Sequence, residues 1–498
     1  MRIDGSKPGA FKDEAFDYVI VGSGAAGATA ARMLSDTGRS VAVIEEGPAI
    51  DPKEFRNEIF PTFKRMFRDQ GSQVARGRAF IPVIQGRCLG GSTVINSAIV
   101  WRLPDDVWQP WRDEHGLGDA LPLAELHKNW DLIERELSVA RTPPAVWGEF
   151  NRLMDVAKKK LGVSAEAIRR NVKDCQASAR CLTGCPTSAK QSMLVTYLPY
   201  AEKKGATLIT SAKAREILWE GDRAVGVAGA FESPGRPRFR ARARKAVIVA
   251  ASAIQTPGLL ARSGVDSPHL GEHFQAHPGC AMTGIFPNKV VMWRGATQGY
   301  DADHHRQDGR FKIETIALQP EIVFARLPGA GRRWMRAMLE TPNAAIWAVQ
   351  MRAWAHGSVR ERFFGTDIQF SLTPRDLVQL RRGLRFTAEL FFAAGAKEVW
   401  PGIHGLPEKI LPGQEWMLET APADSRSYSM ILSHLFGTAR MSLRRSDGVV
   451  GPDFAVHGSK NLFVVDSSIF PTNTGVNPQH TIMGIAMLAA RRISEARL

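Results

Sequence analysis

The chain has 498 residues, which is more than one compact core usually holds, so its length excludes a small binding module. Hydrophobic residues make up 44% of the chain and charged residues 23%, a balance that is ordinary for a folded globular protein and excludes a disordered one. Lys and Arg number 65 against 50 Asp and Glu, and the net charge of +15 favours anionic surroundings: membrane headgroups, an acidic partner protein, an anionic substrate or nucleic acid.

No apolar run reaches the length of about 18 residues that a membrane-spanning helix needs. Residues 1–10 lack the apolar stretch of a secretory signal and contain no twin arginine. A cytoplasmic location is therefore the expectation. The five cysteines are too few, and odd in number, for a disulfide scaffold, which favours reduced thiols or a metal site.

The first predicted elements form a βαβ unit. Residues 17–21 are a short β-branched run typical of a buried parallel strand, and the glycine-rich residues 22–27 follow it directly. Residues 28–34 then predict a helix, and residues 40–45 predict the next strand. In this context the glycine turn predicts a dinucleotide site; the alternative is a glycine turn in an unrelated α/β fold.

Each glycine of this turn has a physical task in a dinucleotide site. Gly22 allows the tight turn, Gly24 lets the backbone approach a pyrophosphate, and Gly27 lets the helix and the strand pack closely. The phosphates then lie at the helix N-terminus, where unpaired N–H groups favour negative charge. Glu45 ends the second strand, where its carboxylate can accept hydrogen bonds from a ribose diol.

Further segments support an α/β fold. A second glycine cluster at residues 86–97 is either bare backbone that lies against a flat ring or a phosphate, or a plain loop. Residues 246–260 predict a buried strand, a tight turn and a helix that begins near Pro257. Residues 461–466 predict another buried strand, which a turn rich in Pro, Gly and Asn connects to a helix at residues 481–493.

Taken together, these segments resemble the glucose-methanol-choline (GMC) family of FAD-dependent oxidoreductases. Residues 86–96 resemble the first family signature and residues 247–264 the second, while residues 433–441 and 476–482 resemble the catalytic segments. The resemblance implies an α/β fold, with a doubly wound, Rossmann-like FAD domain and a second α+β substrate domain. Ser252 departs from the second signature, which usually has glycine there.

The same resemblance divides the chain into domains. We expect a discontinuous FAD domain from residues 13–110, 195–275 and 434–498. Residues 111–194 are the connecting, cysteine-containing segment, and residues 276–433 are the substrate domain, where recognisable motifs become sparse. Segments far apart in the sequence are therefore expected to build one cofactor domain.

The family likeness also assigns the residues that bind FAD. They are Gly22, Gly24, Gly27, Glu45, Arg87, Gly90, Gly91, Ser92, Asn96 and Asp466. Two of these have alternatives, since Asp466 can cap a helix or a turn and Arg87 can pair with a surface carboxylate. Ile95 takes the place at which some family members carry the histidine that binds FAD covalently, so the flavin is expected to be non-covalent and dissociable.

The C-terminal segments supply the catalytic residues by the same resemblance. Alcohol oxidation needs a base that takes the hydroxyl proton while hydride moves to flavin N5, and a pKa near the working pH suits that base. His434 matches the family base, and Asn477 matches a second position at which an amide holds the substrate oxygen. His480 replaces Asn477 if the last helix begins one turn differently.

We expect the FAD-dependent oxidation of an alcohol to an aldehyde or ketone, by a dehydrogenase or an oxidase. The apolar second half of the chain favours aliphatic, aromatic, terpenoid or steroid alcohols over sugars. Two alternatives stay open: a flavoprotein lyase of the cyanohydrin type with redox-silent FAD, and a cytochrome-linked dehydrogenase subunit that acts on a sugar. The electron acceptor is oxygen, a quinone or a cytochrome, and nucleic acid is not expected as a partner.

Cys175, Cys181 and Cys185 are close enough in sequence to surround one cluster or metal. Their spacing resembles the segment that holds a 3Fe-4S cluster in bacterial FAD-dependent glucose dehydrogenase subunits. Long-chain alcohol oxidases and dehydrogenases have a similar segment without an established cluster. Both a 3Fe-4S cluster and a structural thiol group, or one disulfide with a leftover thiol, therefore stay open.

Two basic stretches bear on the partners. Arginines alternate with period two over residues 236–245, which favours one solvated face of a strand over a nucleic-acid site. Between residues 326 and 362, arginines interleave with Trp334, Met335 and Met338. Peripheral membrane contact is one interpretation of this second stretch. The preferred interpretation is a helix whose apolar side packs in the core of the substrate domain.

Overall fold

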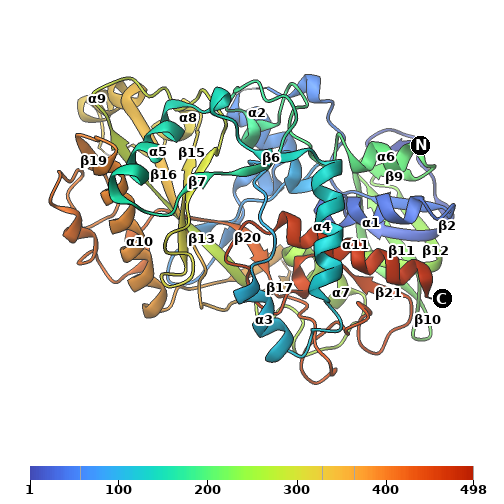
Figure 1. The fold of residues 1–498 in the computed structure, drawn as a ribbon. Coiled ribbons are helices and arrows are strands. Elements are labelled where there is room, and N and C mark those ends of the chain that lie inside the picture. Colours follow the sequence, from blue (N-terminus) through green and yellow to red (C-terminus); the bar gives the residue numbers. More distant parts are fainter. Residues whose placement is uncertain (57, 328, 364, 497–498) are drawn as a thin grey trace.

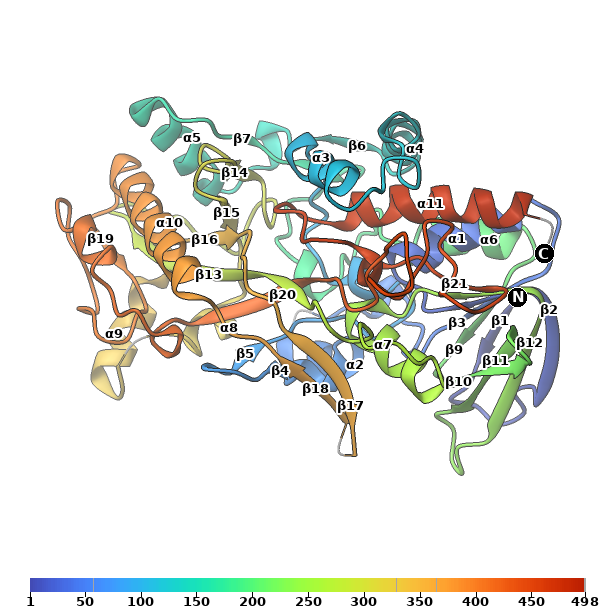
Figure 2. The same ribbon diagram turned by 90° about the horizontal axis from the view of Figure 1, so that it is seen from below.

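Two large sheets lie side by side in the computed structural model, which describes residues 1–56, 58–327, 329–363 and 365–496 (Figure 1). Helices cover both sheets, and a view turned by 90° shows the same two-part arrangement (Figure 2). The predicted α/β fold class is confirmed. The predicted domain boundaries stay a prediction.

The first sheet carries the predicted βαβ unit at its centre. Its strands in spatial order are β1 (Arg2–Asp4), β9 (Thr207–Thr210), β3 (Val41–Ile44), β2 (Asp13–Val21), β12 (Arg238–Val249), β11 (Arg223–Phe231) and β10 (Ala212–Glu220), and β21 (Leu462–Val464) pairs with β12. The pairs from β1 to β12, and the pair of β12 with β21, are parallel. The last two strands, β11 and β10, are added antiparallel.

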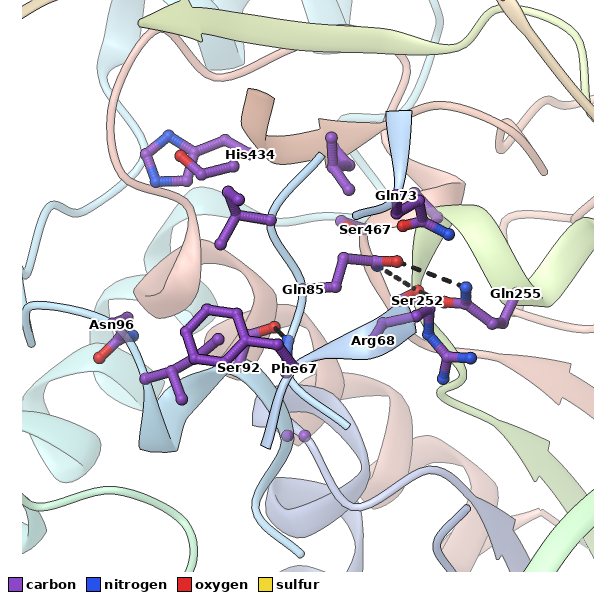
Figure 3. Close-up of a pocket in the computed structure, with 18 of the residues that line it drawn as sticks. Phe67, Arg68, Gln73, Gln85, Ser92, Asn96, Ser252, Gln255, His434 and Ser467 are labelled. Atoms are coloured by element: carbon purple, nitrogen blue, oxygen red, sulfur yellow. Dashed lines mark hydrogen bonds between the residues drawn. The ribbon is translucent and has the colours of Figure 1, made fainter. Parts of the chain in front are cut away.

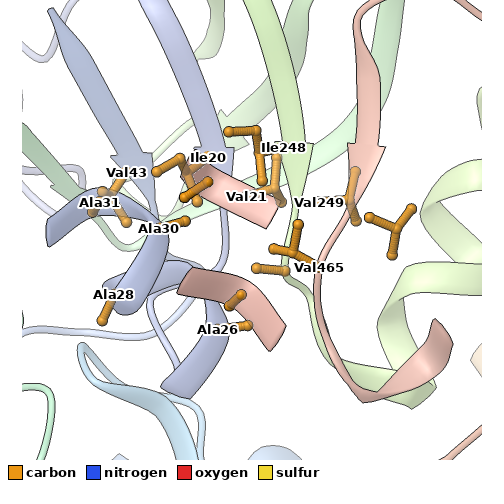
Figure 4. Close-up of a cluster of buried hydrophobic side chains, with 14 of the residues drawn as sticks. Ile20, Val21, Ala26, Ala28, Ala30, Ala31, Val43, Ile248, Val249 and Val465 are labelled. Carbon is orange, nitrogen blue, oxygen red and sulfur yellow. The ribbon is translucent and has the colours of Figure 1, made fainter. Parts of the chain in front are cut away.

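Small residues let the helices of this half pack close to the sheet. Helix α1 (Ala25–Ser35) follows β2 and is rich in buried alanines. Its alanines lie beside Ile20 of β2 and Val43 of β3, which are both fully buried (Figure 4). Helices α11 (Gln479–Glu495) and α4 (Leu123–Glu136) form the next layers outward. Burial on both faces explains why the central strands are nearly continuous apolar runs.

The second sheet is antiparallel. Its strands in spatial order are β19 (Glu398–Trp400), β13 (Gln275–Ile285), β16 (Ala344–Met351), β15 (Phe311–Ile316), β14 (Tyr300–Ala302) and β7 (Glu166–Ala167), and β20 (Met430–Phe436) pairs with β13. Helix α10 (Pro374–Ala393) packs on this sheet, and α5 (Glu149–Leu161) packs on α10. Trp347 of β16 stacks on Phe391 of α10 with ring centroids 4.1 Å apart, which anchors a second hydrophobic core.

Smaller elements complete the fold. They are the hairpins β4 (Val74–Ala75) with β5 (Ile81–Pro82) and β17 (Ser358–Arg362) with β18 (Gly365–Gln369), the pair β6 (Val139–Arg141) with β8 (Arg169–Asn171), and the helices α2 (Ile59–Met66), α3 (Asp105–Asp113), α6 (Tyr197–Lys203), α7 (Ser252–Arg262), α8 (Pro320–Phe324) and α9 (Arg332–Glu340). Among the residues described, no helix has both the length and the apolar character that crossing a membrane requires.

Two local predictions have different outcomes. The alternation over residues 236–245 is confirmed, because arginines of β12 are exposed while the residues between them are buried. The prediction that a helix begins near Pro257 is wrong, because α7 begins at Ser252. Pro257 has no N–H to donate to the Ala253 carbonyl, and Thr438 Oγ1 donates to that carbonyl instead, at 2.6 Å. A hydroxyl from a distant segment thus lets the helix continue through the proline.

Candidate active site

One cavity of about 1140 Å³ has walls from both sheets. Its lining includes the glycine turn and the ends of β2 and β3 from the first sheet, and parts of β13, β15, β16 and β20 from the second. Small-ligand pockets usually have about 300–1,000 Å³, so this cavity has room for a large cofactor together with a substrate. Figure 3 shows part of the lining, where His434 borders the same cavity as Ser92 and Asn96.

The three glycines of the turn after β2 have different surroundings. A Cβ on Gly22 would clash with the Ala250 carbonyl, and a Cβ on Gly27 would clash with the Gly22 carbonyl, so packing requires both glycines. A Cβ on Gly24 would meet no atom within 4 Å, and Gly24 lines the cavity as the N-cap residue of α1. The start of α1 has no side-chain cap, so its N–H groups are available to an anion beside Gly24.

Glu45 follows β3 and is buried beside this turn. Its Oε2 accepts hydrogen bonds from Ser23 Oγ at 2.6 Å and Ser23 N at 3.1 Å, and its Oε1 accepts one from Gly47 N at 2.7 Å. Burial raises the pKa of Glu45, and these hydrogen bonds offset part of the rise. The carboxylate therefore holds the glycine turn in place while it lines the cavity.

Arg87 and Gly90 lie outside the described lining of the cavity. Arg87 forms ion pairs with Glu232 and, at 3.4 Å, with Glu46, so the structure gives it the alternative role of a carboxylate partner. The neighbouring Glu46 does line the cavity. Burial alone would raise the pKa of Glu46, but Arg68 and two further cations hold that pKa well below its usual range. This cluster of charges was not identified from the sequence.

The second glycine cluster forms a wall of the cavity. Gly91, Ser92 and Asn96 all line it. Ser92 Oγ accepts a hydrogen bond from Gly86 N at 2.9 Å. Asn96 Nδ2 donates to Gln479 Oε1 at 2.6 Å, which ties this wall to the first residue of α11. The wall is therefore fixed by hydrogen bonds to the protein itself.

Asp466 lies at the cavity just after β21 and acts as a cap. Its Oδ1 accepts a hydrogen bond from Ser468 N at 2.8 Å. Its Oδ2 accepts from Ser252 N at 2.9 Å and from Thr256 Oγ1 at 2.6 Å. Burial raises the pKa of Asp466 despite these donors. Ser252 has φ +83°, a value that favours glycine. The serine that replaces the usual glycine of the second family signature therefore lies in a strained turn.

Two imidazoles meet at the wall of the cavity. The register of β13 and β20 shifts between Ala276 and Pro278, so that His434 and its neighbour Ser433 oppose His277 alone. Such a bulge re-aims side chains. His434 Nδ1 lies 3.1 Å from His277 Nδ1, and both side chains line the cavity. Burial lowers the pKa of His434 to about 4, although Glu314 acts in the opposite direction.

The proton positions of this pair follow from one backbone contact. Gly475 N donates to His277 Nε2 at 2.9 Å, and a backbone N–H can only donate. His277 Nε2 therefore accepts, and the neutral ring carries its proton on Nδ1, which faces His434 Nδ1 at 3.1 Å and the side-chain amide of Gln350 at 3.2 Å. In this tautomer the Gln350 amide presents its oxygen to Nδ1. His434 Nδ1 then accepts, which places the proton of a neutral His434 on Nε2. Burial and the nearby His434 both hold the pKa of His277 well below its usual value.

Asn477 and His480 have opposite surroundings. Asn477 lines the cavity and helps to lower the pKa of Glu314, while its own buried Oδ1 has no hydrogen-bond partner among the described residues. A buried acceptor of this kind is available to the hydroxyl of a bound molecule. His480 is fully buried outside the described lining, with Nε2 3.8 Å from Glu134 of α4. The alternative in which His480 replaces Asn477 therefore does not fit the structure.

Comparison with known proteins identifies the family. The model of the GMC oxidoreductase N-terminal domain matches residues 16–279, and the model of its C-terminal domain matches residues 358–486. The chain belongs to the GMC oxidoreductase family. This oxidoreductase is therefore a member of a flavoprotein family, as the resemblance predicted.

Several relatives match nearly the whole chain. An uncharacterized GMC-type oxidoreductase of Mycobacterium tuberculosis is 35% identical over 95% of this chain and 75% of its own length. An uncharacterized GMC-type oxidoreductase of Sinorhizobium fredii is 31% identical over 97% of this chain and 94% of its own length. A long-chain-alcohol oxidase of Arabidopsis thaliana is 27% identical over 96% of this chain and 66% of its own length.

Solved structures agree on the fold. Formate oxidase of Aspergillus oryzae superposes with a TM-score of 0.72 at 16% identity, covering 97% of this chain and 99% of that one. Pyridoxine 4-oxidase of Mesorbium loti superposes with a TM-score of 0.71 at 18% identity, covering 97% of this chain and all of that one, 100%. At these identities the likeness concerns the GMC fold alone.

The GMC oxidoreductase has a buried charge cluster next to the imidazoles that was not predicted. Lys312 is fully buried on β15, forms an ion pair with Glu314 and lies 3.5 Å from Asp301. Burial alone would raise the pKa of Glu314, but Lys312 holds it below its usual value. Burial raises the pKa of Asp301 to about 7, although Lys312 acts in the opposite direction. Glu314 also accepts from Gln298 at 2.7 Å, and these two side chains line the cavity.

The predicted cysteine cluster is not supported. Cys175, Cys181 and Cys185 line a second cavity of only about 10 Å³, and their thiols are free. Among the residues described, no three Cys, His, Asp or Glu side chains form a group that could hold a metal ion. Cys181 Sγ accepts a hydrogen bond from Arg170 at 3.1 Å, and Cys185 Sγ accepts one from Lys190 N at 3.5 Å. Protein groups therefore donate to two of the three thiols, those of Cys181 and Cys185.

Proposed function

We propose that this GMC oxidoreductase binds FAD non-covalently in the 1140 Å³ cavity and oxidises an alcohol to an aldehyde or ketone. The observation that carries the proposal is that His434 and Asn477 border the same cavity as the bare turn at Gly24. The names of two relatives, the long-chain-alcohol oxidase of Arabidopsis thaliana and the choline oxidase of Arthrobacter globiformis, support an alcohol as substrate.

The residues present fit FAD. Gly24 and the uncapped start of α1 would receive the pyrophosphate, and Glu45 lies where a ribose would follow. Ile95 lines the cavity with an apolar side chain that forms no covalent bond to a flavin. When bound, FAD supplies the acceptor, N5, for the hydride that leaves the carbinol carbon.

The chain's own residues manage the hydroxyl proton. His434 is the proposed base, and Asn477 would hold the substrate oxygen. In the resting pair His434 already carries its proton on Nε2, as the contact from Gly475 N to His277 requires. To accept the hydroxyl proton, His434 Nε2 must first be unprotonated, so His434 must carry its own proton on Nδ1, between the two rings. His277 Nδ1 then accepts that hydrogen bond, and the proton of His277 lies on its Nε2, which gives up the hydrogen bond from Gly475 N. The two imidazoles therefore act as one unit.

Apolar alcohols are the proposed substrates. The lining of the cavity includes the apolar side chains of Phe63 and Phe67 from α2 and the residue after it, and those of Ile316, Leu318 and Ile322. Such a wall gains free energy from aliphatic or aromatic carbon, about 25 cal/mol for each Å² of apolar surface removed from water. A sugar would leave most of its hydroxyls there without partners.

The decisive experiment is anaerobic addition of alcohols to the FAD-loaded protein. We expect the flavin absorbance near its visible maximum to bleach with long aliphatic or aromatic alcohols, and to change little with glucose. A lyase would leave the absorbance unchanged with every alcohol while it cleaves a cyanohydrin. Purified protein that contains no flavin and takes up none would overturn the proposal altogether.

Replacing Gly24 tests the pyrophosphate site. Gly24→Ala adds a methyl group where no atom lies within 4 Å, so the fold is expected to persist while FAD affinity falls about tenfold or more. Gly27→Ala is the contrasting variant, because its methyl group clashes with the Gly22 carbonyl and is expected to impair folding. Thermal melting of the apoprotein and fluorescence titration with FAD separate the two effects. Equal FAD affinity in Gly24→Ala and the unaltered protein would contradict the assignment.

The pH dependence of flavin reduction tests the state of His434. Burial keeps its pKa at about 4, so the ring is neutral above that pH and loses its capacity as a base only as the pH falls through it. His277, Lys312 and Glu314 are the titratable groups that face it. We expect the acid limb of the reduction rate near pH 4. An acid limb near 6.5, the value of an exposed imidazole, would show that His434 is not buried in the working enzyme.

A further inference from the structure

Helix α9 (Arg332–Glu340) exposes two large apolar side chains. The prediction that this helix packs in the core is wrong, since none of its residues is buried. Met335 is 61% exposed and Leu339 is 79% exposed, and their spacing of four residues places them on one face. Arg332 and Arg336 flank them and form no ion pair with any described residue. These four residues are spaced i, i+3, i+4 and i+7, so one exposed face of the short helix presents apolar and basic side chains together, while Trp334 and Met338 are half-buried. Exposed apolar side chains beside cations suit a membrane surface.

Three more elements extend this surface. Phe60 of α2 is 72% exposed, Phe80 before β5 is 75% exposed, and Phe363 in the turn between β17 and β18 is 95% exposed. In Figure 2, α2, the β4–β5 hairpin, the β17–β18 hairpin and α9 all lie along the lower edge of the molecule. We call α2, these two hairpins and α9 the docking face.

The docking face is strongly basic. Its four elements contain the cations Lys64, Arg65, Arg76, Arg78, Arg332, Arg333, Arg336, Arg360 and Arg362, and the anions Glu340, Glu361 and Asp367. Five of these cations form ion pairs, Arg76 with Asp367 and the other four with carboxylates outside the four elements: Arg65 with Glu54, Arg78 with Asp424, Arg333 with Glu408 and Arg360 with Glu272. Arg362, like Arg332 and Arg336, forms no ion pair among the residues described. An excess of positive charge attracts anionic lipid headgroups, which are therefore the complementary surface.

The cavity opens on the docking face. Its lining includes the exposed side chains of Val74 and Arg76 from the β4–β5 hairpin, Arg326 beside α8 and Arg362 of β17. An alcohol that leaves the lipid here enters the cavity directly. An apolar alcohol dissolves preferentially in a bilayer, so an entrance in contact with lipid spares it passage through water.

We propose that the docking face binds the surface of an anionic phospholipid bilayer and that the cavity takes its apolar alcohol from that bilayer. The proposal rests, for the alcohol, on the proposed function. Single aromatic and aliphatic side chains stand on four separate elements with arginines between them. This spacing suits insertion of each side chain among headgroups, whereas a protein partner usually meets a contiguous apolar patch with fewer charges.

Vesicle binding tests the docking. The FAD-loaded full chain is centrifuged with phosphatidylcholine vesicles and with vesicles that also contain phosphatidylglycerol, at low and high salt. We expect binding to the anionic vesicles only, and release at high salt. The double variants Met335→Ser/Leu339→Ser and Arg332→Glu/Arg336→Glu are each expected to weaken binding about tenfold or more. Equal sedimentation with both kinds of vesicle, or with neither, would overturn the proposal.

A control variant and a soluble substrate make the outcome specific. Val156→Ser/Leu161→Ser removes exposed apolar side chains from α5, which Figure 2 shows on the opposite edge, and should leave vesicle binding unchanged. Thermal melting verifies that each variant folds. Flavin reduction by a short, water-soluble alcohol should be the same in all variants. If no alcohol reduces the flavin of the unaltered protein, the proposed function is refuted. If the alcohol reduces the flavin but the protein does not bind anionic vesicles, only the proposed membrane docking is refuted.

Discussion

His434→Ala is expected to lower the rate of flavin reduction by an alcohol by about 10²–10⁴ while FAD stays bound. The imidazole borders the cavity and is neutral at working pH, because burial lowers its pKa to about 4. Its removal leaves the glycine turn and the wall around Asn96 untouched, so the cofactor site persists. Stopped-flow measurement of flavin bleaching under anaerobic conditions gives the rate, and the flavin content of the purified variant verifies binding.

Rescue distinguishes a proton acceptor from a structural role for His434. The alanine variant leaves a space beside His277, and added imidazole should restore part of the rate with a dependence on the neutral form of imidazole. If His434→Ala reduces its flavin at an unchanged rate, a residue other than His434 is the base. His277 is then the next candidate, because it lines the same cavity 3.1 Å from His434.

Lys312→Met is expected to cost about 3–5 kcal/mol of the free energy of unfolding, the largest stability effect that the structure predicts. Lys312 is fully buried, and its loss leaves the carboxylates of Glu314 and Asp301 together without a cation. Urea denaturation of the apoprotein, followed by tryptophan fluorescence, measures the loss. Tests by more than one probe are needed, because two cores in a chain of this length can unfold separately.

A triple variant serves as the control for Lys312. Adding Asp301→Asn and Glu314→Gln to Lys312→Met removes the uncompensated charge and keeps the shape of each side chain, so most of the lost stability should return. If Lys312→Met alone leaves the denaturation midpoint unchanged, the cluster is hydrated in solution and not buried as the structure shows it.

The sequence was sufficient for the glycine turn and for the strands β2, β3, β12 and β21 of the first sheet, but not for β1, β9, β10 and β11. A glycine pattern between a β-branched run and a helix has few other uses, and the resemblance to the GMC family extended it to residues 434 and 477. His277 and Glu314 lie on strands whose polar residues alternate with apolar ones. That pattern also describes a strand with one solvated face, so only the packing of β13, β15 and β20 shows that these residues face a cavity.

Two outcomes depend on distant segments that the sequence alone does not place. The helix at Pro257 continues because Thr438, far along the chain, donates to a carbonyl that the proline leaves free. The three cysteines are neighbours in sequence, but Arg170 and Lys190 N supply their hydrogen bonds. In α9 the pattern of apolar and basic residues was visible, yet periodicity alone does not show whether an apolar stripe faces a core or the outside.

The bulge between β13 and β20 has a mechanical consequence. His277 and His434 are carried by two strands that are hydrogen-bonded to each other within the second sheet, whereas the glycine turn belongs to the first. A hinge movement between the sheets would therefore carry both rings as a rigid body, with their mutual spacing preserved. Opening the cleft would instead change how far the rings stand from whatever the glycine turn holds. It would also stretch the contact of His277 with Gly475, which follows β21 of the first sheet, so such a movement would reset the proton positions of the pair.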